Sequence, residues 1–119
     1  MIKRKRYKIA ISKAAIQDIA SIKRYILQTF HYREYAENFS KKIKKAIQDI
    51  SKFPQIFTKT GYEIQAYDIY VKICDSYLIF YVMEEAQITV IRVLKDCMNW
   101  QKIIKQSAQK VTDCLDGIS

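Results

Sequence analysis

Arg92 is the side chain whose position in this sequence most needs a chemical explanation. It lies in the run Gln87 to Leu94, where apolar and polar residues alternate as in a half-buried strand. That alternation predicts one face shared by Ile88, Val90, Arg92 and Leu94. A charge on such a face is costly unless a carboxylate pairs with it or the face opens into a cleft, where the guanidinium fork can hold two phosphate oxygens. Asp68 and Asp96 are the carboxylates considered as partners.

Other candidate side chains lie on neighbouring predicted strands. Lys59 and Lys72 can supply a cationic rim or, if desolvated, a base with a lowered pKa; the alternative is a solvated lysine. Tyr70 and Tyr81 can stack on RNA bases, although aromatic residues at strand spacing also serve as packing residues.

A lysine-rich helix face is the third feature that points to a ligand. In the predicted helix from about Tyr32 to Phe53, the lysines fall opposite the apolar arc. They are Lys41, Lys44, Lys45 and Lys52. Clustered lysines can neutralise phosphates of RNA or DNA, but they carry no sequence information, and a solvated face is the alternative.

The elements that position these residues follow from apolar spacing. Residues 7 to 12 alternate as a first strand and end at Ser12, a helix N-cap residue. Apolar residues at three- and four-residue intervals then predict a helix to about Phe30, with a corner at His31 and a second helix that ends before Pro54.

The second half reads as a meander of strands. Residues 62 to 67 are a possible short strand after a turn at Gly61, and the later strands run from about residue 68 to Cys74, Tyr77 to Met83 and Gln87 to Leu94. A last helix from Trp100 to about Gln109 is predicted, followed by a weakly structured tail from Lys110. The order predicts an α+β domain over residues 1–109, in which an antiparallel two-helix hairpin packs on one face of a mainly antiparallel sheet and leaves the other face open.

Composition limits the class of protein. The 119 residues fit one domain, and the formal charge of +9 suits a polyanionic or acidic partner. Three cysteines without CxxC spacing predict neither a disulfide framework nor a zinc site, and no cofactor is expected. No apolar run approaches the length of a membrane span, so we expect a soluble, cytoplasmic protein without membrane contact.

The sequence from about Arg6 to Ile104 resembles the RelE/ParE toxins of bacterial type II toxin-antitoxin systems. The matching segments are ISKAAIQDI, YAENFSKKIKKAIQDISKFP, DSYLIFYV, and ITVIRVL followed by NWQKII. The resemblance implies a toxin that a cognate antitoxin neutralises. RelE-like members cut messenger RNA on the ribosome and ParE-like members inhibit DNA gyrase.

The resemblance also implies roles for particular residues. Metal-free RNA cleavage needs a base, cations that stabilise the phosphorane charge, and an acid for the leaving oxygen. Arg92 resembles the strand arginine that holds the scissile phosphate in RelE-like nucleases. Glu63 is the carboxylate in the loop where some members carry their base; the alternative is an ordinary loop glutamate. The chain departs from the nuclease pattern at Tyr70, where many members have arginine, and in LKDCMNWQ, which lacks their terminal tyrosine or histidine.

The expectation from the sequence is therefore a toxin that acts as a ribosome-dependent messenger RNA endonuclease with Arg92 as phosphate stabiliser. The partners expected are the antitoxin, the ribosome and messenger RNA. The alternatives are a non-catalytic gyrase inhibitor and a non-toxic member that only binds its antitoxin.

Overall fold

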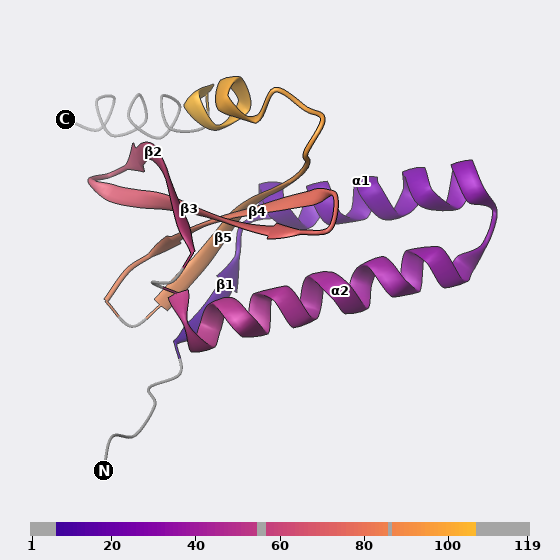
Figure 1. Cartoon of the computed structure of the whole chain (residues 1–119), viewed down its shortest axis with the longest axis horizontal. Coiled ribbons are helices and arrows are strands. Elements are labelled where there is room, and N and C mark those ends of the chain that lie inside the picture. The colour runs from indigo at the N-terminus through magenta and orange to yellow at the C-terminus, as the bar shows by residue number, and fades with distance from the viewer. Residues whose placement is uncertain (1–6, 55–56, 86, 107–119) are drawn as a thin grey trace, which may run out of the picture.

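The computed structural model of the protein describes residues 7–54, 57–85 and 87–106. A helical hairpin covers one face of a five-stranded sheet, and its two helices project side by side beyond the sheet (Figure 1). The elements are β1 (Lys8–Ile11), α1 (Lys13–Phe30), α2 (Arg33–Lys52), β2 (Thr58–Ile64), β3 (Tyr67–Cys74), β4 (Tyr77–Met83) and β5 (Gln87–Lys95). A short helix over residues 100–106 follows β5. The predicted continuation of this helix to Gln109 and the tail from residue 110 lie outside the described residues.

The sheet is mainly antiparallel, as predicted. The strand order is β1-β5-β4-β3-β2, and only β1 pairs in parallel, with β5. The β3–β4 turn at Asp75-Ser76 forms where its turn chemistry indicated, with Asp75 at a φ of 54°.

The helix boundaries also agree with the sequence signals. Ser12 caps α1, because its Oγ accepts a hydrogen bond from the backbone N–H of Ala15 at 3.1 Å. α1 ends at Phe30, and its C-cap residue His31 adopts a left-handed φ of 60° and donates its backbone N–H to the carbonyl of Leu27. α2 ends at Lys52, ahead of Pro54. The hairpin therefore follows from local caps and breakers.

The turn before the meander differs from the prediction. β2 begins at Thr58, ahead of Gly61, and the turn to β3 is at Gln65-Ala66, which have φ values of 53° and 71°. Gly61 lies within β2 at a φ of +90°, where the register with β3 shifts between Lys59 and Glu63. Gly61 therefore forms the bulge, since glycine adopts this φ without strain. The turn at Gln65-Ala66 was not predicted, because neither residue type is a typical turn signal.

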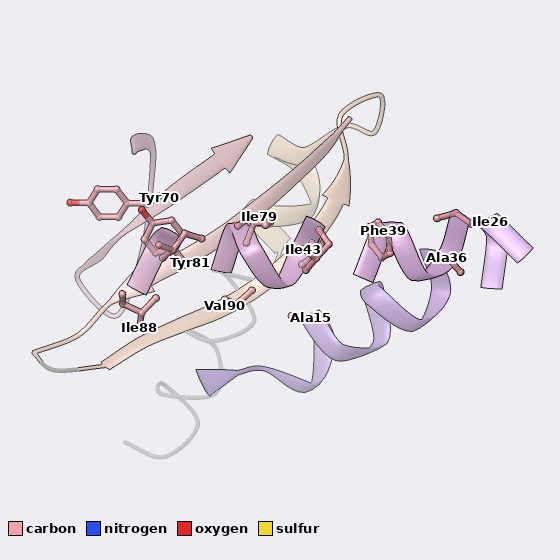
Figure 2. Close-up of a cluster of buried hydrophobic side chains, with 13 residues drawn as sticks. Ala15, Ile26, Ala36, Phe39, Ile43, Tyr70, Ile79, Tyr81, Ile88 and Val90 are labelled. Carbon is pink, nitrogen blue, oxygen red and sulfur yellow. The ribbon is translucent and has the colours of Figure 1, made fainter. Parts of the chain in front are cut away.

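The main core lies between the helices and the sheet. Figure 2 shows its side chains, which come from α1, α2 and the three central strands. They include Ala15, Phe39, Ile43, Ile79, Tyr81, Ile88 and Val90.

A second core covers the opposite face of the sheet, which the sequence had suggested would be open. Ile69, Phe80 and Leu94 from the sheet pack there with the fully buried Ile104 of the last helix. The ring of Trp100 lies 5.3 Å from that of Phe80, tilted by 36°. The prediction of an open concave face was therefore wrong over this region, because the C-terminal helix buries apolar side chains against it.

Candidate functional site

A bulge in β5 determines the surroundings of Arg92. Arg92 lies opposite Phe80, but Tyr81 lies opposite Val90, so Ile91 is an extra residue. Val90 belongs to the helix-side core, whereas Leu94 belongs to the second core on the opposite face. The expectation of one continuous face from Ile88 to Leu94 was wrong, because the extra residue reverses the alternation.

Arg92 forms a bidentate ion pair with Asp18 of α1. Its Nε lies 2.7 Å from Oδ2 and its Nη2 lies 2.9 Å from Oδ1. The backbone N–H of Val93 donates to the same carboxylate at 3.0 Å. Asp18 therefore takes the place of the acidic partners considered from the sequence, Asp68 and Asp96.

The same contacts close the edge of β5 where β1 stops. Ser12 donates its backbone N–H to the carbonyl of Val90 and its hydroxyl to the carbonyl of Ile91, both at 2.9 Å. Asp18 then receives the next free N–H, that of Val93. Because a strand edge with unpaired backbone groups is unfavourable when covered by protein, α1 substitutes for the missing length of β1. The Arg92–Asp18 pair belongs to this junction.

Lys59 and Glu63 lie on the opposite margin of the sheet, on the edge strand β2. The Nζ of Lys59 lies 3.3 Å from Oδ2 of Asp68, and this carboxylate raises the pKa of Lys59. A lysine acting as a base near neutral pH needs a lowered pKa, so the shift is opposite to the one proposed. Glu63 is exposed and lies across from Asp68 in the β2–β3 register.

Tyr70 and Tyr81 pack in the core, where their rings stack at 5.4 Å (Figure 2). Tyr81 is fully buried, and its hydroxyl donates to the carbonyl of Pro54 at 2.6 Å. Burial raises the pKa of Tyr81. A ring enclosed in this way has no free face for an RNA base, so the structure corresponds to the packing alternative for both tyrosines.

The lysine-rich face of α2 and the predicted rim lysine Lys72 meet between α2 and β3. Lys45 of α2 and Lys72 of β3 line one cleft of about 300 Å³, together with Lys42. Lys42 pairs with Asp75 at 2.6 Å, and the Nζ of Lys72 lies 4.3 Å from the ring centroid of Phe57. Arg92 lines a different cavity, so the proposed catalytic cations do not converge on one site.

The cavity beside Arg92 is a largely apolar groove that sequence reasoning missed. Its volume is about 380 Å³, and Ile22, Tyr25 and Met98 line it between α1, β5 and the loop that follows β5. Tyr25 is 54% exposed and Met98 is 45% exposed. We call this cavity the α1–β5 groove. Sequence periodicity cannot show it, because its walls come from segments about 70 residues apart.

Exposed aromatic residues at the tip of the hairpin were also missed. Phe30, the last residue of α1, is 50% exposed, and its ring lies 5.4 Å from that of Tyr35. Tyr32 is 64% exposed and lies 5.7 Å from the same ring. The sequence feature that could have indicated this cluster is the high density of aromatic residues around the corner between the two predicted helices.

Comparison with known structures first defines the class of fold. The chromosomal ParDE toxin-antitoxin system from P. aeruginosa has a chain similar to this one, with a TM-score of 0.63 and 10% identity over 75% of this chain and 95% of that chain. The archaeal RelE-RelB complex from Pyrococcus horikoshii OT3 gives a TM-score of 0.44 and 17% identity over 76% of this chain and 96% of that chain. The chain therefore shares its fold with the similar chain of the ParDE system.

The family follows from the sequence comparison. A family model described as the ParE toxin of the type II toxin-antitoxin system, parDE, matches residues 9–100. The chain therefore belongs to the ParE toxin family. No curated protein matches the sequence. Within the described residues, no helix combines the length and the hydropathy that a membrane span requires.

Proposed function

We propose that this toxin inhibits DNA gyrase by binding, without catalysing a reaction, and that a cognate antitoxin neutralises it. The observation that carries the proposal is the bidentate pair between Arg92 and Asp18 at 2.7 and 2.9 Å. The carboxylate of Asp18 occupies the Nε–Nη2 edge of the guanidinium, an edge that could otherwise hold two phosphate oxygens, and its negative charge offsets that of Arg92. In this structure that edge belongs to the junction between α1 and β5. Membership of the ParE family supports the same proposal.

The second candidate function is a ribosome-dependent messenger RNA endonuclease. One observation favours it: the Arg92 side chain is 25% exposed and lines the α1–β5 groove, so a phosphate in that groove can compete with Asp18. In this mechanism Arg92 stabilises the phosphorane charge. Lys59, Lys72 and Glu63, the other catalytic residues proposed from the sequence, lie on β2 and β3.

The test is induction of the chain in a bacterial host, with growth, plasmid supercoiling and new transcript 5′ ends followed together. Gyrase inhibition predicts growth arrest, relaxed plasmid and intact transcripts. Arrest with new ends inside reading frames and normal supercoiling would contradict the proposal and support the nuclease.

Two variants distinguish a catalytic role of Arg92 from its contribution to folding stability. Arg92→Ala and Asp18→Asn both break the ion pair. Only Arg92→Ala removes the guanidinium. A nuclease that uses Arg92 loses cleavage in Arg92→Ala and keeps it in Asp18→Asn. If the toxin inhibits gyrase, both variants are expected to lose toxicity to a similar extent, in proportion to the loss of folded toxin. Immunoblotting measures the amount of toxin that remains.

We also propose that an apolar segment of the antitoxin occupies the α1–β5 groove. The relatives in known structures are toxin-antitoxin systems, and the exposed Tyr25 and Met98 give an apolar segment a surface to cover. Lys95 lies 5.4 Å from the ring of Tyr25 and provides a cation at the rim for an acidic side chain of the antitoxin.

Replacement of Tyr25 tests the groove. Tyr25→Glu is expected to abolish rescue by the co-expressed antitoxin while the chain stays toxic. The neighbouring exposed Arg24 provides the control, since Arg24→Glu leaves the apolar lining intact and is expected to be rescued. Full rescue of Tyr25→Glu would place the antitoxin elsewhere.

A further inference from the structure

The C-terminal half of α2 carries a concentration of positive charge that gyrase inhibition does not explain. Residues 41 to 52 contain five lysines and one aspartate, whereas residues 33 to 40 contain one arginine and two glutamates. The net positive charge is therefore confined to the half of the helix that lies away from the hairpin tip (Figure 1).

Three of these lysines form a row. At 3.6 residues per turn, Lys41, Lys45 and Lys52 fall within about 40° of one line along the helix, opposite the buried Ile43, Ala46 and Ile50. The row spans about 16 Å, which corresponds to about five base pairs of a duplex. All three are exposed, and no ion pair to them is seen in the described part of the chain.

The row continues onto the sheet. Lys45 lines the same cleft as Lys72 of β3, where Asp49, Asp75 and Lys42 also lie, so lysines outnumber carboxylates across the α2–β3 junction. Lys44 lies on the other flank of the row, in a cavity with Ile9 and Ile11 of β1. The backbone N–H of Tyr7 donates to the carbonyl of Ser51 at 3.4 Å, so Tyr7 lies beside the C-terminal end of α2.

We propose that this surface, formed by Lys41, Lys44, Lys45, Lys52 and Lys72, binds the phosphodiester backbone of a duplex nucleic acid. Lysines at helical spacing on a rigid element suit regularly spaced phosphates, and they give binding that does not depend on base sequence. Binding of single strands uses aromatic platforms; no position from Lys41 to Lys52 is aromatic, and the ring of Phe57 beside Lys72 is already in contact with the Nζ of that lysine at 4.3 Å. The surface thus fits the outside of a duplex better than unpaired bases.

The experiment measures binding of the full-length chain to a fluorescent 20-base-pair DNA duplex of arbitrary sequence, over a range of salt concentrations. Matched RNA duplex and single-stranded DNA are measured beside it. The main variant is Lys41→Gln, Lys45→Gln and Lys52→Gln combined, which removes the row and keeps good helix formers. The control variant is Lys23→Gln, Arg24→Gln and Lys102→Gln combined, which removes the same charge from exposed positions on α1 and the last helix.

The main variant is expected to lose affinity on the order of a hundredfold at 0.1 M salt and to reduce the salt-dependence slope by about 2 to 3, because each phosphate contact contributes about 0.9. The control is expected to stay within about threefold of the natural chain. Preference for the DNA or the RNA duplex identifies the source of the phosphates. Equal losses in both variants, tighter binding to the single strand, or no duplex binding by the natural chain would overturn the proposal. Because these are binding measurements on purified components, their outcome is independent of whether the toxin inhibits gyrase.

Discussion

At the scale of residues, the pair between Arg92 and Asp18 joins two elements that are distant in the sequence. The carboxylate accepts three hydrogen bonds, two from the guanidinium and one from the backbone of Val93. The side chains are 25% and 14% exposed, so solvent screens the pair only partly. The contact therefore stabilises the attachment of α1 to β5 whatever the target of the toxin.

Removal of either partner is expected to destabilise the fold. Arg92→Ala and Asp18→Asn are each expected to lower the free energy of unfolding by about 2 kcal/mol, as for hydrogen bonds to charged groups. Urea unfolding of the two single variants and the double variant measures the coupling between the side chains. Strictly additive losses would show that Arg92 and Asp18 act independently.

The Tyr81 hydroxyl gives a second prediction at this scale. Its pKa is raised in the folded protein, whereas the unfolded chain ionises near the ordinary value of 10.0. The contribution of Tyr81 to stability is therefore fully present below pH 10 and is lost as the pH rises above it, since the unfolded state then releases a proton that the folded state keeps.

Tyr81→Phe is expected to cost about 1 kcal/mol at neutral pH, because the carbonyl of Pro54 loses its donor. The fall in unfolding free energy between about pH 9 and about pH 11 is also expected to become shallower. Denaturant titrations across this range check both effects. Tyr32→Phe, at an exposed ring, serves as the control, and an unchanged alkaline slope in Tyr81→Phe would contradict the assignment.

At the scale of elements, the C-terminal helix decides whether the second face of the sheet is covered. Ile104 is fully buried against Phe80 and Leu94, and Trp100 lies between the rings of Phe80 and Tyr62 at 5.3 and 6.1 Å. The helix spans only residues 100–106 as described, too short to be stable alone in water. Its structure thus depends on packing.

Ile104→Ala is expected to lower the free energy of unfolding by about 3 kcal/mol through the lost burial and the cavity left behind. Lys105→Ala, at the adjacent exposed position, is expected to change it by less than about 0.5 kcal/mol. The single tryptophan, Trp100, reports the docking of the helix by fluorescence. Similar stabilities of the two variants would show that the helix does not depend on this contact.

At the scale of the whole molecule, the formal charge of +9 governs encounters with partners. Lys41, Lys44, Lys45 and Lys52 lie on α2, whereas the α1–β5 groove lies between the other helix and β5. The proposed duplex-binding surface and the proposed antitoxin groove therefore occupy different parts of the protein.

The net charge predicts how the antitoxin associates. With an acidic antitoxin, the association rate constant is expected to fall by at least about tenfold between 50 mM and 500 mM salt, while the dissociation rate constant changes much less. Stopped-flow or biosensor kinetics measure both constants. A salt-independent association rate would show that apolar contact alone controls the encounter.

The sequence by itself determined the order, type and approximate limits of the helices and the later strands. Those features depend on local chemistry: the Ser12 cap, the stop before Pro54, the Asp75-Ser76 turn and apolar spacing. Where local chemistry was ambiguous, as at Gly61 and Gln65-Ala66, the prediction placed the turn wrongly.

Only the tertiary structure decided what the candidate site residues contact. Asp18 lies 74 positions from Arg92, and the extra residue in β5 alters the alternation on which the expected face depended. The sequence left a packing role and an RNA-stacking role open for Tyr81. Its burial and its hydrogen bond to the carbonyl of Pro54 decide for packing. These features arise from contacts between distant segments and from register, neither of which a period-2 or period-3.6 pattern encodes.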